Sequence, residues 1–278
     1  QNVDSSDFPN EFKYSTESWQ TMELVVLAVP FMLLFVFTGL RWLALIGWFI
    51  FGISWLLKLP YYLSISDYFN SLLMVAAFGL FAAISIASYR DLENIQTYRE
   101  VTAFSALASL FYFPFALNGY LYRSIIETVT IQTAILANFL GIPIQIYDWN
   151  ILTLGGRFVE IILACTGIES MSLFAGAILG VKADAGKKVK ALLVSVPVIY
   201  VLNLLRNTFI IAIYGYSVFG DPDTSFFIAH NIMSKFGATI ALIAISLAVF
   251  RILPELADLI FRLYEALKSF WGVRIASA

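Results

Sequence analysis

Seven apolar runs dominate this sequence, and their lengths constrain its fold more than any other feature. A helix that crosses a lipid bilayer needs about 20 apolar residues, because the hydrocarbon offers its backbone no hydrogen-bond partner. The chain is 60% hydrophobic and 13% charged, unlike a soluble domain. The runs are residues 22–40, 42–57, 71–88, 101–117, 159–181, 191–214 and 227–253. The sequence therefore predicts an all-α polytopic membrane protein with about seven transmembrane helices.

The segments around these runs divide the chain into five predicted parts. A long connection at 118–158 links the fourth and fifth runs; its first half has helical periodicity, and its second half is strand-like or irregular. Residues 254–278 place apolar side chains at helical spacing between charges, which predicts an amphipathic surface helix. The other parts are an N-terminal segment at 1–21, a four-helix membrane part at 22–117 and a three-helix core at 159–253.

Loop charges predict the orientation in the membrane. Positively charged residues gather in cytoplasmic loops, and the loop 182–190 holds four lysines. Threading the chain from this loop places the N-terminus and the connection 118–158 on the extracytoplasmic side and the C-terminal helix inside. We therefore expect a multi-pass protein of the plasma (cytoplasmic) membrane.

Composition excludes several classes of function. A single cysteine, Cys165, rules out an internal disulfide, and a single histidine, His230, rules out the usual multi-histidine metal sites. The sequence has no basic tract of the kind that binds nucleic acid. We expect no metal, no cofactor and no nucleic-acid partner.

Arg206 lies inside the apolar run 191–214. A guanidinium near the bilayer centre costs from about 3 to more than 10 kcal/mol, and it cannot escape this cost by losing its proton. Such a residue needs a charged partner, a watery cavity or a functional role.

Cys165, Arg206 and His230 are predicted to share one layer of the membrane. At about 1.5 Å of helical rise per residue, Cys165 lies about 9 Å and Arg206 about 12 Å below the outer surface. His230 lies near the outer start of the last run. A thiolate is a nucleophile, a histidine can carry its proton, and an arginine can stabilise a developing oxyanion. These three side chains predict a cysteine acyl-transfer site.

Four neighbouring residues are candidates for supporting roles. Thr166 and Gly167 follow the cysteine, and the glycine allows a close approach of a helix or a substrate. Asn203 shares a helical face with Arg206 and is suited to orient it. Glu169, four residues after Cys165, is a candidate ion-pair partner for Arg206.

The sequence A-C-T-G at 164–167, the N-x-x-R at 203–206 and the downstream His230 resemble the exosortase/archaeosortase family. The resemblance covers roughly residues 150–255, and Thr166 stands where the family usually has serine. It implies a membrane cysteine enzyme that recognises surface proteins with a C-terminal signal, which consists of a motif, a transmembrane helix and a basic tail. Such an enzyme cleaves near the motif and transfers the protein to an acceptor, in archaea a membrane lipid.

The sequence leaves two alternatives open. Some archaeosortases have arginine in place of the histidine, which makes Arg251 an alternative to His230; it lies 21 residues further along, about 30 Å on a helix. The alternative functions are a secondary transporter whose buried arginine binds an anionic substrate, an intramembrane cysteine protease without transfer, and a structural membrane protein.

Overall fold

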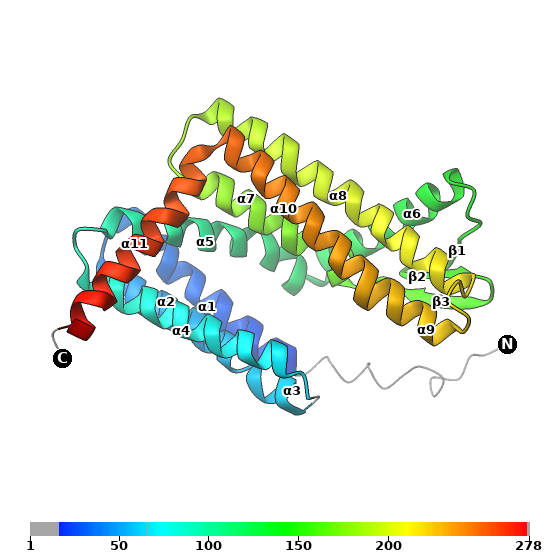
Figure 1. Cartoon of the computed structure of the whole chain (residues 1–278), viewed down its shortest axis with the longest axis horizontal. Helices are drawn as coiled ribbons and strands as arrows, with labels where there is room; N and C mark the ends of the chain where they lie inside the picture. The colour runs from blue at the N-terminus through cyan, green and yellow to red at the C-terminus, as the bar shows by residue number, and fades with distance from the viewer. Residues whose placement is uncertain (1–16, 65, 277–278) are drawn as a thin grey trace. The chain divides into compact units, whose positions relative to one another are not determined.

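The computed structural model describes residues 17–64 and 66–276. They form two compact units, one from the described parts of residues 1–106 and 259–278, the other from residues 107–258 (Figure 1). Five helical segments in the described residues are long and apolar enough to cross a membrane, and two further apolar helices are shorter. The five are Arg41–Ser64, Tyr68–Arg90, Ile95–Leu117, Ala185–Gly215 and Pro222–Ile252, and the shorter two are Leu24–Thr38 and Ile168–Gly180. The chain is therefore a mostly helical, polytopic membrane protein.

All the secondary-structure elements in the described part of the first unit are helices. Its elements are α1 (Glu17–Thr38), α2 (Arg41–Leu56), α3 (Leu59–Ser64), α4 (Tyr68–Arg90), the first half of α5 (Ile95–Leu117) and most of α11 (Pro254–Ala276). α1 and α2 form a tight hairpin, because Gly47 has no side chain and a Cβ there would lie 2.8 Å from Met32 Cγ. The buried carboxylate of Glu100 accepts a 2.7 Å hydrogen bond from Arg262, which ties α11 to α5.

The second unit combines helices with a small sheet. Its elements are the rest of α5, α6 (Gly119–Phe139), β1 (Gln145–Asp148), β2 (Ile151–Leu154), β3 (Arg157–Glu160), a 3-10 turn (Leu163–Cys165), α7 (Ile168–Gly180), α8 (Ala185–Gly215), α9 (Pro222–Phe227), a π-helical turn (Ile228–Met233) and α10 (Ser234–Ile252). α8 packs against both α7 and α10 and runs on to the sheet (Figure 1). This unit contains all the predicted site residues.

The sheet is antiparallel with strand order β1-β2-β3. The β2–β3 turn consists of Gly155 and Gly156, both with positive φ, as a two-residue hairpin of this twist requires. Leu152 and Leu154 point to the core, where they pack with apolar residues of α6 and α8. Gly155 lies against the end of α8, because a Cβ there would lie 2.6 Å from the carbonyl oxygen of Gly215.

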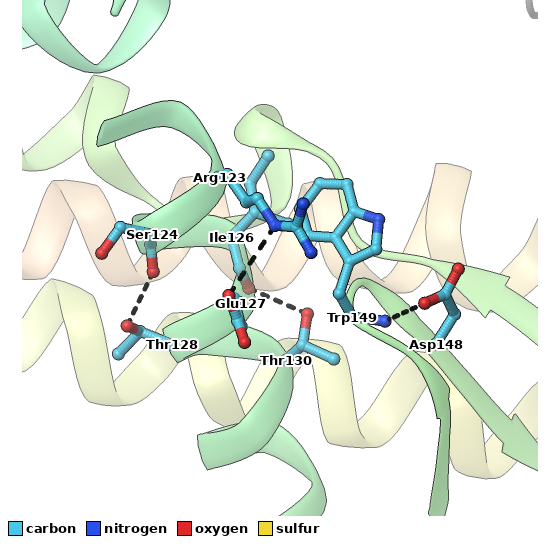
Figure 2. A network of polar contacts seen from close by, with 8 residues as sticks. All are labelled: Arg123, Ser124, Ile126, Glu127, Thr128, Thr130, Asp148 and Trp149. Atoms are coloured by element: carbon cyan, nitrogen blue, oxygen red, sulfur yellow. Dashed lines mark hydrogen bonds and ion pairs between the residues drawn. The ribbon is translucent and has the colours of Figure 1, made fainter. Parts of the chain in front are cut away.

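α6 is fastened to the β1–β2 turn by a cation–π contact. The guanidinium of Arg123 lies 5.0 Å from the centre of the Trp149 ring and 4.0 Å from the carboxylate of Glu127 (Figure 2). Asp148 accepts a 2.7 Å hydrogen bond from the backbone N–H of Trp149. Together with the core beneath, these contacts fix the sheet on α6.

Two sequence predictions are corrected here. The fold is not all-α, because the second half of the connection 118–158, which the sequence predicts as strand-like or irregular, forms a sheet that extends to Glu160. The fifth run, 159–181, is not one helix: it holds β3, the 3-10 turn and, only from Ile168 on, α7. Counting helical rise therefore does not give the depth of Cys165, since the backbone before Ile168 is not α-helical. The helical first half of the connection and the C-terminal helix are confirmed.

Candidate functional site

Cys165 lies in a tight turn between the sheet and α7. After β3, the N–H of Cys165 donates to the carbonyl of Ile162 over 2.8 Å, which closes the 3-10 turn. Thr166 is fully buried, and its hydroxyl donates to Leu163 and accepts from the N–H of Ile168. Gly167 then takes the left-handed conformation, with φ +76°, and α7 begins. The cysteine thus precedes a helix instead of lying within one.

Two asparagines of α8 hold the backbone of the cysteine. The side-chain N–H groups of Asn203 and Asn207 donate to the carbonyl oxygen of Cys165, at 2.6 and 2.9 Å. They lie four residues apart and so share one face of α8. Gly167 leaves room for Asn203, because a Cβ there would lie 3.2 Å from two Asn203 carbons. Asn203 therefore binds the cysteine turn, where the sequence suggested that it would orient Arg206.

Arg206 lies between the two asparagines in sequence, and its charge acts on the Cys165 thiol. Cys165 itself lies outside the five helices that are long and apolar enough to cross the membrane. Burial raises the pKa of the thiol, while a backbone hydrogen bond with Ile162 and the positive charge of Arg206 lower it in part; Glu160 raises it further. Within the described chain, Arg206 forms no hydrogen bond or ion pair. The pKa of this partly buried thiol is therefore raised, and Arg206 is the cation that favours its ionised form.

Glu169 does not pair with Arg206 in this structure. Its exposed carboxylate accepts a 3.4 Å hydrogen bond from the hydroxyl of Tyr112 on α5. Cys165 and Glu169 are four residues apart in the sequence but do not share a helical face, because Gly167 separates the 3-10 turn from α7. The carboxylate that interacts with the thiol is Glu160, which accepts a 3.0 Å hydrogen bond from Asn150.

His230 lies in the π-helical turn before α10, and this turn packs against α8. Its ring stacks on Phe226, with centroids 5.2 Å apart and an angle of 6° between the planes. Phe226 in turn meets Tyr214 edge-on at 5.3 Å. Single π-helical turns inside helices often mark functional positions, and the plane of the His230 ring is set by its stacking on Phe226.

Arg251 lies in the last turn of α10. α10 is one continuous helix from Ser234, and 21 residues of helix correspond to about 30 Å. The structure therefore gives His230 and Arg251 positions at opposite ends of the same helical segment.

Sequence reasoning missed Asn207 and Glu160. Asn207 had a usable signal, since a second asparagine four residues after Asn203 in an apolar helix needs a polar partner. Glu160 had none, because the apolar run 159–181 predicts a helix that begins there, whereas Glu160 is the last residue of β3. Among the described residues, no group of three histidine, cysteine or carboxylate side chains is arranged to hold a metal ion.

Comparisons with known proteins match this chain over most of its length. A family model described as transmembrane exosortase matches residues 17–250. Archaeosortase A of Haloferax volcanii is 32% identical over an alignment of 250 residues, with 77% of this chain and 81% of that protein covered. Archaeosortase A of Natronomonas pharaonis is 25% identical over 258 residues, with 82% and 80% covered. No solved structure matches. The matched region contains the cysteine turn, the asparagine pair and Arg206, and the chain belongs to the exosortase/archaeosortase family.

Proposed function

We propose that this protein is a membrane-embedded cysteine transpeptidase that cleaves the C-terminal sorting signal of surface proteins. Cys165 forms a thioester with the new C-terminus, which then passes to an acceptor, a membrane lipid. The observation that carries this proposal is the double hydrogen bond from Asn203 and Asn207 to the Cys165 carbonyl. It fixes the cysteine backbone on the helix that carries Arg206. The archaeosortase relatives and the resemblance in A-C-T-G and N-x-x-R support the substrate class.

In the first step, His230 accepts the thiol proton, and the thiolate of Cys165 attacks the scissile carbonyl carbon. A base is needed because burial raises the pKa of this thiol. The carbonyl oxygen becomes an oxyanion, which Arg206 stabilises through its N–H donors. The C–N bond then breaks, and His230 returns the proton to the departing amine.

In the second step, a hydroxyl or amine of the lipid acceptor attacks the thioester. His230 accepts the proton of the attacking group, Arg206 again stabilises the oxyanion, and the thiolate leaves. The enzyme regains its thiol when His230 returns the proton. Attack by water in place of the lipid would make the protein a protease without transfer.

α8 supports the proposed orientation of the site. Its first turns carry Lys187, Lys188 and Lys190, and Arg206 lies 16 residues beyond Lys190, about 24 Å along the helix. With the lysines in the cytoplasm, the cysteine turn lies toward the extracytoplasmic face. We propose seven membrane helices, with the N-terminus outside and the C-terminus inside, and the five candidate spans with two shorter apolar helices support that number.

Substitution of the nucleophile tests the proposal. The assay uses archaeal cells that lack their own archaeosortase and express a reporter protein ending in a motif, a transmembrane helix and a basic tail. Cys165→Ala should abolish cleavage of the reporter, and Cys165→Ser should retain little, because a hydroxyl is a much weaker nucleophile. Arg251→Ala tests the alternative third residue and is expected to remain active if His230 carries the proton. Unchanged cleavage by Cys165→Ala would refute the proposal.

The mass of the released reporter distinguishes transfer from hydrolysis. Transfer adds the mass of a lipid to the new C-terminus and keeps the reporter with the membrane fraction. Hydrolysis leaves a free carboxylate and releases the protein. A Cys165-dependent product with a free carboxylate alone would retain the cysteine chemistry but exclude the lipid acceptor.

A further inference from the structure

β3 is an edge strand whose outer side has no hydrogen-bond partner in the described chain. The strand order β1-β2-β3 leaves one side of β3 unpaired. Every backbone hydrogen bond that β3 makes within the described residues goes to β2. The neighbouring helices cover a face of the sheet, where Leu152 and Leu154 are buried. The free edge thus offers backbone donors and acceptors, as edge strands do.

The register identifies the residues that face this free edge. The N–H of Ile161 donates to the carbonyl of Asn150 over 2.7 Å, which makes these two a hydrogen-bonded pair. Hydrogen-bonded pairs alternate along an antiparallel ladder, so Val159 and Arg157 also bond to β2. The N–H and C=O groups of Phe158 and Glu160 therefore point away from β2. Both side chains are exposed.

This edge leads directly to the nucleophile. Glu160 ends β3, five residues before Cys165, and its carboxylate is close enough to the thiol for their charges to interact. The carbonyl clamp from Asn203 and Asn207 fixes the turn that follows β3. A chain laid along β3 would consequently end near the turn that carries the thiol.

We propose that the free edge of β3 binds an extended segment of the substrate as a fourth strand and presents its scissile bond to Cys165. The inference rests on the proposed function and specifies the conformation in which that substrate binds. Backbone N–H and C=O groups of the substrate pair with those of Phe158 and Glu160, the mode known as β-strand addition. Because these contacts involve only the backbone, they align the substrate whatever its side chains are.

Proline substitution tests the edge without breaking the ladder. Phe158→Pro removes the outward N–H but no bond to β2, and proline is tolerated at such edge positions. Ile146→Pro is the matched control on the other edge of the sheet. Ile146 lies opposite Leu152, whose backbone N–H and C=O bond to β3 and not to β1. The backbone groups of Ile146 therefore point to the free edge of β1. The side chains of Ile146 and Phe158 are equally exposed, at 46% each. Phe158→Ala removes the ring and keeps the N–H.

The measurement is the KM and kcat of the full-length protein in lipid nanodiscs, with the reporter protein described above. Phe158→Pro should raise KM about 3- to 10-fold, the worth of one hydrogen bond, with kcat little changed. Ile146→Pro and Phe158→Ala should retain the wild-type KM. Alkylation of Cys165 by iodoacetamide at the wild-type rate shows that each variant is folded around the site.

A second measurement leaves the protein unchanged. Reporters in which single amide groups before the scissile bond are replaced by esters lose one N–H at a time. A rise in KM at every second position, as strand pairing requires, supports the proposal, and no position-dependent rise overturns it. Wild-type KM in Phe158→Pro, beside an inactive Cys165→Ala, would refute the edge site alone. Processing by Cys165→Ala would instead refute the proposed function.

Discussion

The side-chain amide of Asn207 donates a 2.9 Å hydrogen bond to the carbonyl oxygen of Cys165, the same oxygen that Asn203 contacts at 2.6 Å. The cysteine turn and α8 are consequently held together by backbone-directed bonds, which leave the thiol free to react. Arg206 lies on the same helix as the two asparagines. The relative position of nucleophile and cation is therefore set by two amide side chains.

Removing either amide should weaken this link. Asn207→Ala and Asn203→Ala should each lower the free energy of unfolding by about 1–2 kcal/mol, and the double variant by more than the sum, because the Cys165 carbonyl then has no donor. Thermal unfolding in detergent measures the stability of each variant, and reporter cleavage measures its activity. Asn207→Asp should be worse than Asn207→Ala, since it places a carboxylate against a carbonyl oxygen. Wild-type stability in the double variant would contradict the role of the pair.

Gly167 should tolerate no side chain, for two separable reasons. Gly167→Ala costs about 1–2 kcal/mol for a left-handed backbone and also places a Cβ 3.2 Å from Asn203. Gly141 has a similar φ of +81°, and a Cβ there would meet nothing within 4 Å. Gly141→Ala should therefore lose stability only, measured by thermal unfolding, whereas Gly167→Ala should lose reporter cleavage as well. Equal behaviour of the two variants would show that the contact with Asn203 is unimportant.

The sequence predicted the helical, membrane-spanning character of the chain because the bilayer enforces it. Long apolar runs have few alternatives in hydrocarbon, and a buried arginine needs a reason to be there. Arg206 could therefore be selected from its position alone. Cys165 followed because it is the one nucleophilic thiol in the chain.

The turn that holds Cys165 could not be predicted in the same way. Residues 159–181 are apolar whether they form a strand, a turn or a helix, and a hydropathy pattern does not separate these forms. β3 exists because it pairs with β2 and packs on α6 and α8, which are tertiary contacts. For the same reason, the sequence predicts Arg206 as the neighbour of both Glu169 and Asn203, whereas Glu169 bonds to Tyr112 of α5 and Asn203 to the carbonyl of Cys165.

The reactivity of Cys165 should follow the charges around it. Burial raises the pKa of the thiol, so the pH of half-maximal alkylation by iodoacetamide should lie above that of a free cysteine. Arg206→Met removes a positive charge that stabilises the thiolate, and should raise this pH further. Glu160→Gln removes a negative charge, and should lower it. Since Cys165 is the only cysteine, mass spectrometry of the intact protein gives the rate at each pH.

Arg251→Met controls for the loss of a remote cation in this experiment. Its alkylation profile should coincide with that of the wild type, because Arg251 is not among the charges that act on the thiol. A shift of the same size in Arg251→Met and Arg206→Met would indicate an effect of net charge instead of a local contact.

His230 and Arg251 are the two candidates for the third member of the site, and each predicts a different effect of alanine substitution on reporter cleavage. If His230 transfers the proton, His230→Ala should reduce reporter cleavage about 10²- to 10⁴-fold, and Arg251→Ala should leave it near wild type. Phe226→Leu keeps an apolar side chain but removes the stacked ring, which should cost roughly 2- to 10-fold and change the pH profile of cleavage. Full activity in His230→Ala together with loss in Arg251→Ala would transfer the role to Arg251. That result would require the Arg251 end of α10 to reach the cysteine turn, although 21 residues of helical chain separate Arg251 from His230.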